Sequence, residues 1–418
     1  MYILVLNCGS SSLKYKVYSE QTMQAVVGGL VEKIGQDDSF ITQKYPDGKK
    51  DKKEVPMKNH DEALGIVFNM LRAASIDMND IGGVGHRVVM GGDTFKSSVE
   101  IDDQVIKKIE ECIPLAPLHN PAGLKGINAA KQLLPNAKQV AVFDTAFHQT
   151  MPEYAYTYPL PKVYRDVLGA RRYGFHGTSI LSATIISSGI LGIPAEKCNL
   201  IILHIGSGAS ATAIRGGRSV DTSMGMTPTP GLTMGTRCGD IDPAIIPYAE
   251  KKLGLNADQI LAHLNKDSGL LAITECFSDR RDIEANSATN EKCRLAMDIE
   301  VHNVKKYIGA YMAELGHVDA IVFTAGVGEN DDILRERFCS GLEELGIKLD
   351  KEANKTAIAR KGINKAILST PDSRIKILMI AADEELVIAN DTLAIKNGTF
   401  NPDPLKMNYS FAKMDKSR

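Results

Sequence analysis

Near its start the chain reads Tyr2-Ile-Leu-Val-Leu-Asn7-Cys-Gly9-Ser-Ser-Ser12-Leu-Lys14-Tyr-Lys-Val-Tyr18. An apolar run, a turn of small residues and a second run predict two strands, Tyr2–Asn7 and Leu13–Tyr18, joined by a tight hairpin. The same pattern returns halfway along, where the apolar run Leu200–Ile205 leads into Gly206-Ser-Gly208-Ala-Ser210. Two such hairpins suggest two related domains that face each other across a cleft. A chance recurrence of Gly/Ser turns is the alternative.

The turn of the first hairpin has the composition of a phosphate-binding loop. Backbone N–H groups and the hydroxyls of Ser10 and Ser12 form a concave set of donors that suits phosphate oxygens. Lys14 can add positive charge, and the amide oxygen of Asn7 can orient a water molecule on Mg²⁺. An ordinary surface hairpin with a solvated lysine is the competing interpretation.

Elsewhere, short apolar runs alternate with longer amphipathic stretches, which predicts an α/β protein with mixed sheets covered by helices. Further strands are expected at Gly83–Val89, Val140–Asp144, Ser210–Ile214, Ala320–Thr324 and Ile375–Ala381. Helices are expected at His60–Ser75, Asp103–Cys112, Ala122–Leu134, Ser179–Ser188, Pro243–Leu253, Ala257–Leu264, Lys292–Leu315 and Glu384–Ile395.

Length and composition narrow the class of protein. A chain of 418 residues predicts two or three domains. Because 49 Lys and Arg nearly balance 51 Asp and Glu, giving a net charge of −2, partners such as nucleic acid or a membrane surface are not expected. The seven cysteines show no CxxC spacing, which indicates a reducing cytosol and neither a disulfide framework nor a zinc site. No apolar run is long enough to span a membrane, and the short apolar start predicts a strand and not a signal peptide.

Several Gly-flanked segments carry chemically useful side chains. Arg87 and Arg237 stand beside turns, where an arginine can clamp an anion with two hydrogen bonds, although each alone is more often a surface ion pair. Asp144 closes a strand, and in open α/β sheets that end faces the ligand crevice. The turn Gly326–Asn330 permits the close approach of a flat nucleoside, or is simply a strand-to-helix connection capped by Asn330 or Asp331. The acidic run Asp383–Glu385 either places a carboxylate near a metal or favours a helix N-terminus.

Familiar nucleotide and hydrolase motifs are missing from the sequence. The pattern GxxxxGK[ST] does not occur, and no GxGxxG follows a strand and opens a helix. Neither GxSxG nor HExxH is found, which weakens the hydrolase and zinc-protease interpretations.

Seven ordered motifs between residue 2 and about residue 390 resemble the acetate kinase (acetokinase) family. They are Asn7-x-Gly-Ser-Ser-Ser-x-Lys14, Gly85-His-Arg-Val-Val89-x-Gly-Gly92, Ala116-Pro-Leu-His-Asn-Pro121, Phe143-Asp-Thr-Ala-Phe-His148, Tyr173-Gly-Phe-His-Gly177, Gly235-Thr-Arg-Cys-Gly239 and Gly326-x-Gly-Glu-Asn330. The resemblance implies a two-domain actin-like ATPase fold, with duplicated ribonuclease H-like domains and a central cleft. It implies a first domain of residues 1–150 completed by 384–418, and a nucleotide-binding domain of residues 151–383. The implied protein is a cytoplasmic homodimer.

The implied reaction is the reversible, Mg²⁺-dependent transfer of a phosphoryl group from ATP to acetate, giving ADP and acetyl phosphate, with Mn²⁺ as an alternative metal. Asn7 and Glu384 would bind the metal, and Ser10, Ser12 and Lys14 would approach the ATP phosphates. Arg87 would hold the acetate carboxylate, while Arg237 and His176 would stabilise the transferring phosphoryl group. The expected acid-site residues are Val89, Leu118, His119, Phe175 and Pro228. The expected nucleotide-site residues are His204, Ile205, Gly206, Ser207, Gly208, Asp279, Arg280, Arg281, Gly326, Val327, Gly328, Glu329 and Asn330.

Asp144 matches the family's presumed proton donor or acceptor, but acetate is already ionised at pH 7, so no proton need be removed. We therefore expect Asp144 to orient an arginine or Mg²⁺. Ser207, Met90 and Arg280 depart from the family's usual Asn, His and Phe, and Arg280 is expected to touch the nucleotide instead. The intact Gly326–Asn330 motif favours ATP over pyrophosphate as the donor. A propionate or butyrate kinase is the nearest alternative, and an actin- or chaperone-like ATPase switch is a more distant one.

Overall fold

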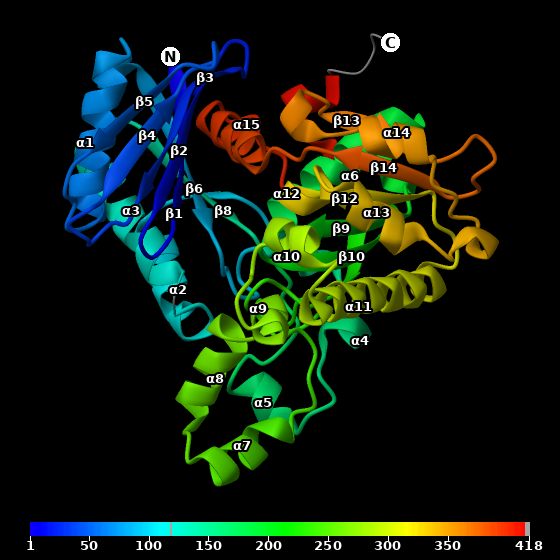
Figure 1. The fold of residues 1–418 in the computed structure, drawn as a ribbon. Helices are drawn as coiled ribbons and strands as arrows, with labels where there is room; N and C mark the ends of the chain where they lie inside the picture. The colour runs from blue at the N-terminus through cyan, green and yellow to red at the C-terminus, as the bar shows by residue number, and fades with distance from the viewer. Residues whose placement is uncertain (118, 414–418) are drawn as a thin grey trace. The chain divides into compact units, whose positions relative to one another are not determined.

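A computed structural model describes residues 1–117 and 119–413 of the chain. Contacts divide it into two units. The first unit comprises residues 1–149 together with the segment that starts at Asp383, and the second comprises Thr150–Ala382. Each unit is a mixed sheet with helices packed on it, so the α/β expectation is confirmed (Figure 1).

The first unit is built on an eight-stranded sheet of order β5-β4-β3-β2-β1-β6-β8-β7. Its strands are β1 (Tyr2–Cys8), β2 (Leu13–Ser19), β3 (Ala25–Glu32), β4 (Phe40–Lys44), β5 (Lys50–Glu54), β6 (Ile81–Val88), β7 (Val99–Glu100) and β8 (Lys138–Phe143). Strands β1 to β5 form an antiparallel meander, whereas β6 runs parallel to β1 and β8 runs parallel to β6.

Helices cover both faces of this sheet. The helices of the unit are α1 (His60–Ala73), α2 (Asp103–Glu111), α3 (Asn120–Leu133) and α15 (Glu384–Lys396). Val84 packs in one apolar core with residues of α1 and α3, whereas its neighbours Gly83 and Gly85 lie against α15. Because successive residues of a strand point to opposite faces, α15 lies on the face opposite α1 and α3.

The two glycines let α15 approach the sheet closely. A methyl group added at Gly85 would lie 2.4 Å from Thr392 Oγ1 and 2.5 Å from Ile388 Cγ2, both on α15. Asp383 caps this helix by accepting a hydrogen bond from the backbone N–H of Leu386 at 2.9 Å. The cap and the close packing fix the first turn of α15, which carries Glu384 and Glu385.

The second unit contains a six-stranded sheet of order β11-β10-β9-β12-β14-β13. Its strands are β9 (Leu200–Ile205), β10 (Ala209–Arg215), β11 (Arg218–Thr222), β12 (Ala320–Thr324), β13 (Lys365–Ile367) and β14 (Lys376–Ile380). Its helices are α4 (Glu153–Tyr156), α5 (Lys162–Asp166), α6 (Gly177–Leu191), α7 (Ile245–Leu253), α8 (Ala257–Lys266), α9 (Gly269–Thr274), α10 (Arg280–Asn286), α11 (Glu291–Leu315), α12 (Ala325–Gly328), α13 (Asp332–Cys339) and α14 (Lys351–Thr356). Helix α6 packs on β9, β12 and β14, and α11 packs on β9 and β10.

The two sheets share one topology. Strands β3-β2-β1-β6-β8 of the first unit correspond in order and direction to β11-β10-β9-β12-β14 of the second. In both, an antiparallel meander of three strands is followed by two parallel strands beside its first member. The predicted repeat of strand, small-residue turn and strand is therefore part of a duplicated sheet.

The sequence patterns missed strands β3, β4, β5, β7, β11 and β13. Strand β5 reads Lys-Asp-Lys-Lys-Glu and is mostly exposed, so no apolar alternation marks it. Strand β3 contains Gly28 and Gly29, residues that usually weaken a strand pattern. The ring of Tyr15 on β2 lies over Gly29, where any side chain would clash at about 2.5 Å. Strand β3 forms by pairing with β2, β4 pairs with β3, β5 pairs with β4, and β11 pairs with β10.

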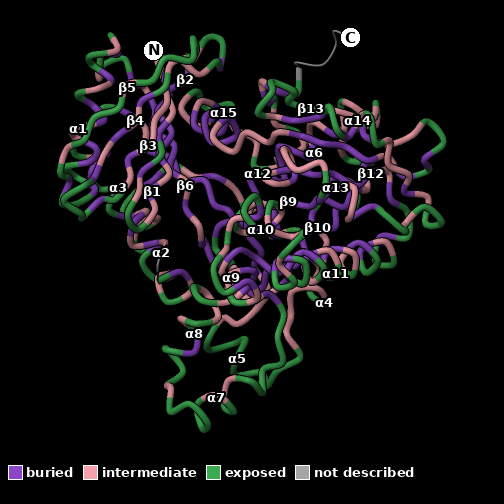
Figure 2. Tube along the Cα trace, in the orientation of Figure 1, coloured by how far each residue is buried: buried purple, intermediate pink, exposed green. Residues whose placement is uncertain are grey.

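Most strands of both sheets are buried, whereas α5 and α7 are largely exposed (Figure 2). Across the part of the chain that the structure describes, no helix is both long and apolar enough to cross a membrane.

Close packing at Gly85 predicts a stability difference between two glycine substitutions. Gly85→Ala should lower the free energy of unfolding by about 1–3 kcal/mol, because the methyl group would push α15 off the sheet. Gly65→Ala, inside α1 with open space around its Cα, should raise it by about 0.5–1 kcal/mol. Urea denaturation of both variants measures these changes, and equal effects at the two positions would contradict close packing at Gly85.

Candidate functional site

The turn of the first hairpin is held by backbone bonds that leave its serines exposed. The N–H of Gly9 donates to the carbonyl of Ser12 at 2.8 Å, and His60 Nε2 lies 2.8 Å from the carbonyl oxygen of Gly9. Ser10 and Ser11 are exposed and Ser12 is half-buried. The turn is thus braced from below, and its hydroxyl groups are accessible to an anion.

Charged side chains gather on the face of the first sheet that α15 covers. Asn7 and Lys14 are paired across β1 and β2, so their side chains lie on the same face. Lys14 Nζ forms an ion pair with Glu385 in the first turn of α15. Lys16, two residues along β2, forms an ion pair with Asp383 at 2.9 Å.

Arg87 leaves the end of β6 on this face and is held by Asp144 at the end of β8. Its Nε and Nη2 atoms donate to the two carboxylate oxygens at 2.9 and 2.7 Å, and its Nε lies 4.0 Å from Glu384 Oε2. Burial alone would lower the pKa of Arg87, but the charges of Asp144 and Glu384 raise it overall. Burial, followed by repulsion from Asp144 and Glu385, raises the pKa of Glu384 against the lowering effect of Arg87.

The neighbouring residue His86 is part of the core. It points to the opposite face, is buried, and its Nε2 lies 2.8 Å from Gln139 Oε1. Burial lowers the pKa of His86 to about 4.

The formal charges around Arg87 sum to a net negative charge, which favours the binding of a cation. Asp144, Asp383, Glu384 and Glu385 carry four formal negative charges, and Lys14, Lys16 and Arg87 carry three positive ones. Oxygen donors with an excess of negative charge suit Mg²⁺, which one or two carboxylates commonly hold together with substrate phosphates. Within residues 1–117 and 119–413, no group of three or more His, Cys, Asp or Glu residues is arranged so that it could hold a metal ion.

In the second unit, the turn after β9 is held from three sides. The N–H of Gly206 donates to the carbonyl of Gly208 at 3.0 Å, and the N–H of Gly235 donates to the carbonyl of Ser207 at 3.2 Å. Arg280 Nη1 donates to the carbonyl of Gly206 at 2.7 Å, and its Nε donates to Glu300 Oε1 at 2.6 Å. Arg280 and Glu300 are both buried. Arg280 therefore anchors the turn to helix α11.

His176 and Arg237 lie beside this turn. A methyl group at Gly208 would sit 3.4 Å from Arg237 Nη1 and 3.7 Å from His176 Nε2. His176 has a left-handed φ of 62°, stacks on His204 at a ring distance of 3.9 Å, and places Nδ1 2.9 Å from Ser210 Oγ. Burial lowers the pKa of Arg237, whose Nη1 donates to the carbonyl of Pro228 at 3.1 Å.

A cavity of about 370 Å³ opens next to the turn. It is lined by Gly206, Ser207, Ser278, Asp279, Arg280, Arg281, Glu284, Gly326, Val327, Asn330, Asp331, Asp332 and Arg360. Eight of these were expected to contact a nucleotide. His204, Ile205, Gly208, Gly328 and Glu329 were also expected there but do not line the cavity, and Ile205 is completely buried.

The turn that begins with α12 shapes one wall of this cavity. Glu329 folds back, and its Oε1 accepts a hydrogen bond from the N–H of Ala325 at 2.8 Å, so it braces the turn. Asn330 Nδ2 donates to the carbonyl of Gly326 at 2.9 Å, and its Oδ1 accepts from the N–H of Arg360 at 2.8 Å. Asp331 caps α13 through the N–H of Leu334.

Five lining residues could not be found from sequence patterns: Ser278, Glu284, Asp331, Asp332 and Arg360. Asp331 was weighed only as a helix cap. Arg360 lies at the cavity because its backbone N–H donates to Asn330 Oδ1, a tertiary contact that local sequence patterns do not predict. Burial, then the charge of Asp331, raises the pKa of Glu284, whereas the bond from Arg281 lowers the pKa of Asp279 to about 2.

The residues expected to contact a small acid belong to both units. Val89 follows β6 and His119 precedes α3 in the first unit, whereas Phe175 and Pro228 lie in the second. Phe175 is buried, and Val89 and Pro228 are half-buried. Leu118 lies outside the described residues.

A family model and similar known proteins all indicate one family. The model of the acetokinase family matches residues 2–390. The acetate kinase of Geobacter sulfurreducens is 49% identical over 420 residues, which cover 99% of each chain. The acetate kinase of Caldanaerobacter subterraneus subsp. tengcongensis is 50% identical over 405 residues, covering 95% of this chain and 100% of that protein.

Solved structures agree with this result. The acetate kinase of Porphyromonas gingivalis superposes with a TM-score of 0.89 at 44% identity, covering 94% of this chain and 99% of that one. A propionate kinase from Francisella tularensis gives a TM-score of 0.87 at 39% identity, with 93% and 98% covered.

The buried pair Arg280–Glu300 predicts a non-additive pair of substitutions. Arg280→Met or Glu300→Leu alone should lower the free energy of unfolding by about 3–5 kcal/mol, because each leaves an unpaired buried charge. The double variant should be clearly more stable than either single variant, although Gly206 loses its donor. Urea denaturation of the three variants checks this, and additive losses would show that the two charges do not depend on each other.

Proposed function

The chain belongs to the acetokinase family, and from this membership we propose how its residues carry out the family's reaction. The protein is a kinase that acts on acetate and uses ATP and ADP, and it has the two-domain actin-like ATPase fold. The proposal assigns roles to individual residues, the metal and each of the two units, together with a compartment and an oligomeric state.

We propose that Arg87 holds the acetate carboxylate, and the observation that carries this assignment is its hydrogen-bonded fork on Asp144. The fork uses Nε and Nη2 and fixes the plane of the guanidinium group. The remaining N–H groups then have a defined direction in which to meet a carboxylate. A fixed cation in a partly buried position binds a small anion more strongly than a mobile surface arginine does.

Asp144 acts in this proposal by orienting Arg87. Acetate has a pKa close to that of Asp and Glu side chains, about 4, so it is ionised at neutral pH and is already a nucleophile. A general base has no proton to remove from it.

Mg²⁺ would be held by Asn7 and Glu384, with the negative excess on this face as support. The ion would supply positive charge to offset the negative charge of the phosphate groups. Ser10, Ser12 and Lys14 of the first hairpin would approach the ATP phosphates.

The second unit would serve the nucleotide. The cavity beside the turn at Gly206–Gly208 would take the nucleoside, and Arg237 and His176 would stabilise the transferring phosphoryl group. Phosphoryl transfer depends mainly on positioning and charge neutralisation, which these groups supply. We assign the first phosphate hairpin, the acid-binding segments and the metal to the first unit, and nucleotide binding to the second.

A cytoplasmic location agrees with the seven cysteines, all of which are free thiols. A homodimer agrees with apolar side chains on α5, α7 and the adjoining segments of the second unit. Val163, Val167, Leu168, Tyr248 and Leu253 are exposed there. Figure 1 shows α5, α7 and α8 grouped at one end of this unit, and such apolar surface is typical of a subunit interface.

Removal of the Arg87 guanidinium group should abolish both its binding of the acid and the positive charge that it provides to stabilise the transition state. Arg87→Ala should lower kcat/KM for acetate about 100- to 1000-fold. Acetyl phosphate formed from ATP and acetate can be trapped with hydroxylamine and measured by colour. Asp144→Asn should lose less than Arg87→Ala, because the amide still offers one acceptor to the guanidinium.

The control is Arg72→Ala, an exposed arginine of α1 whose Nη1 donates to Asn69 on the same helix. It should retain normal activity. Near-normal turnover in Arg87→Ala would refute the assignment of acid binding, and a lack of acetate-dependent colour in the unmodified protein would refute the proposed function itself.

An acidic residue in the apolar group should separate the subunits. Val167→Asp and Leu253→Asp should each convert a species of twice the chain mass into one of the chain mass in sedimentation velocity runs, because a charge would be buried without a partner. Leu295→Asp, on an exposed position of α11, should leave the larger species intact. A larger species that survives both Val167→Asp and Leu253→Asp would place the interface elsewhere.

A further inference from the structure

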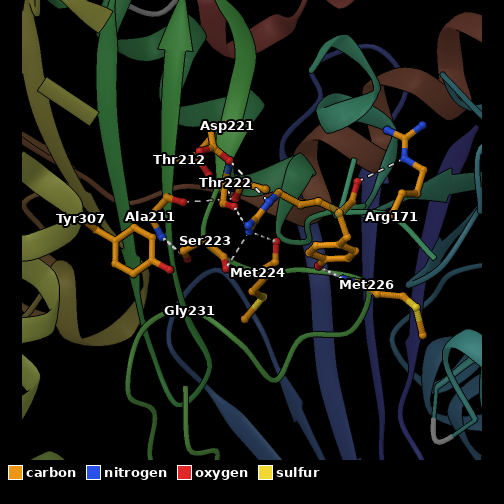
Figure 3. Close-up of polar contacts among 12 residues, drawn as sticks. Arg171, Ala211, Thr212, Asp221, Thr222, Ser223, Met224, Met226, Gly231 and Tyr307 are labelled. Atoms are coloured by element: carbon orange, nitrogen blue, oxygen red, sulfur yellow. Dashed lines mark hydrogen bonds and ion pairs between the residues drawn. The ribbon is translucent and has the colours of Figure 1, made fainter. Parts of the chain in front are cut away.

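Arg172 occupies an unusual position in the second unit: one of its nitrogen atoms contacts three consecutive carbonyl groups. Its Nη1 donates to the carbonyls of Thr222 at 2.6 Å, Ser223 at 3.1 Å and Met224 at 3.1 Å. Its Nε lies 3.6 Å from Asp221 Oδ1. Figure 3 shows Thr222, Ser223 and Met224, which follow one another at the end of β11.

The hydrogen bonds from Arg172 to these three carbonyls, called here the Arg172 clamp, lie where the sheet ends and a long irregular segment begins. Between Thr222 and Ile245, a stretch that the structure describes throughout, the chain forms no helix or strand. Near its start, hydrogen bonds join Ser223 to Ala211 of β10. Carbonyls that leave a sheet need other donors, and a guanidinium fork supplies several at once.

Backbone and aromatic contacts extend the clamp along the same segment. The N–H groups of Tyr173 and Gly174 both donate to the carbonyl of Gly225, at 3.0 and 3.2 Å. The hydroxyl of Tyr158 accepts a hydrogen bond from the N–H of Met226 at 3.0 Å, and a methyl group at Gly225 would lie 2.3 Å from that hydroxyl.

The far end of the segment is closed as well. The N–H of Gly231 donates to Asp240 Oδ1 at 2.8 Å, and the hydroxyl of Tyr307 donates to Asp240 Oδ2 at 2.7 Å. The loop of residues 223–240 is therefore fixed at both ends, by Arg172 at its start and by Asp240 at its end.

Arg172 joins two segments of the chain, and each leads within a few residues to His176 or to the carbonyl that holds Arg237, the two side chains proposed to stabilise the transferring phosphoryl group. In one direction the chain runs from Arg172 to His176, whose left-handed backbone has to be imposed by its surroundings. In the other it runs from Met224 to Pro228, whose carbonyl accepts the hydrogen bond from Arg237. His176 and Arg237 then meet beside Gly208.

We propose that Arg172 is a positioning residue for phosphoryl transfer: by clamping the carbonyls of residues 222–224 it sets the positions of His176 and Arg237 relative to each other. The inference rests on the proposed roles of those two residues. Arg172 itself does not line the nucleotide cavity, so its effect has to pass through the segments that it joins.

The test compares turnover with nucleotide affinity in Arg172→Lys. Lysine keeps the charge but cannot serve three carbonyls and Asp221 from one planar group. We expect kcat to fall about 10- to 100-fold, since a displacement of about 1 Å in a catalytic group can cost two orders of magnitude. The Kd for ADP, measured by calorimetry without turnover, should stay within twofold, because ADP lacks the transferring phosphoryl group.

Two further variants serve as controls. Arg215→Lys alters an exposed arginine that also donates to a backbone carbonyl, that of Glu314, and should leave kcat and the ADP affinity unchanged. Tyr158→Phe removes the acceptor for the N–H of Met226 while leaving Arg172 in place. It should reduce kcat several-fold with normal ADP binding, and it keeps the test valid if Arg172→Lys does not fold.

The proposal is overturned if Arg172→Lys turns over normally, or if kcat and ADP affinity fall in parallel in both Arg172→Lys and Tyr158→Phe. Parallel assays of His176→Ala and Arg237→Ala separate the positioning role of Arg172 from the transfer role of the pair. If these two variants are active, the proposed function of the pair fails; if they are inactive while Arg172→Lys is normal, only the positioning role fails.

Discussion

A buried guanidinium group needs oxygen atoms to accept its hydrogen bonds. In this chain the acceptors are carboxylate side chains and backbone carbonyls in the turns that follow the strands. Arg87 is held by Asp144, Arg172 by three carbonyls after β11, and Arg280 by Glu300 and the carbonyl of Gly206. Arg335 is fully buried and donates to the carbonyl of Gly328, in the turn beside the cavity of the second unit. Arg172, Arg280 and Arg335 therefore each place donors of a desolvated guanidinium group on backbone carbonyls and so fix a piece of irregular backbone.

Fixed backbone matters here because several of the turns that we assign to binding lie outside regular structure. Strands β1 and β9 end at Cys8 and Ile205, and the serine turn and the glycine turn follow directly. A duplicated topology brings two equivalent hairpins to these positions, but their sequences have diverged. The first turn carries exposed serines braced by His60, whereas the second carries glycines braced by Arg280. One sheet topology thus carries two turns of different chemistry.

Sequence patterns predicted the buried parts well, and the reason is physical. Leu200–Ile205 and Ala320–Thr324 are apolar runs because both faces of their strands are covered. Edge strands such as β5 lack that constraint, so their polar sequence resembles a loop. Motifs led directly to Arg87, Asp144 and Arg237. They could not reveal that Glu329 braces its own turn, or that Arg360 reaches Asn330, because both facts depend on tertiary contacts.

Asp144 is the residue whose motif and contacts point to different roles: the motif suggests a proton donor or acceptor, whereas the contacts indicate a residue that orients Arg87. Each of its carboxylate oxygens accepts a short hydrogen bond from Arg87, and its side chain is almost completely buried. A base needs a free lone pair directed at the proton that it removes, and the acceptor in this reaction brings no such proton. In a kinase that phosphorylates a hydroxyl group, an aspartate at this position would have to be free. Because the acceptor is ionised, Asp144 need not transfer a proton. The same side chain can instead hold Arg87, the cation that we propose binds the acid.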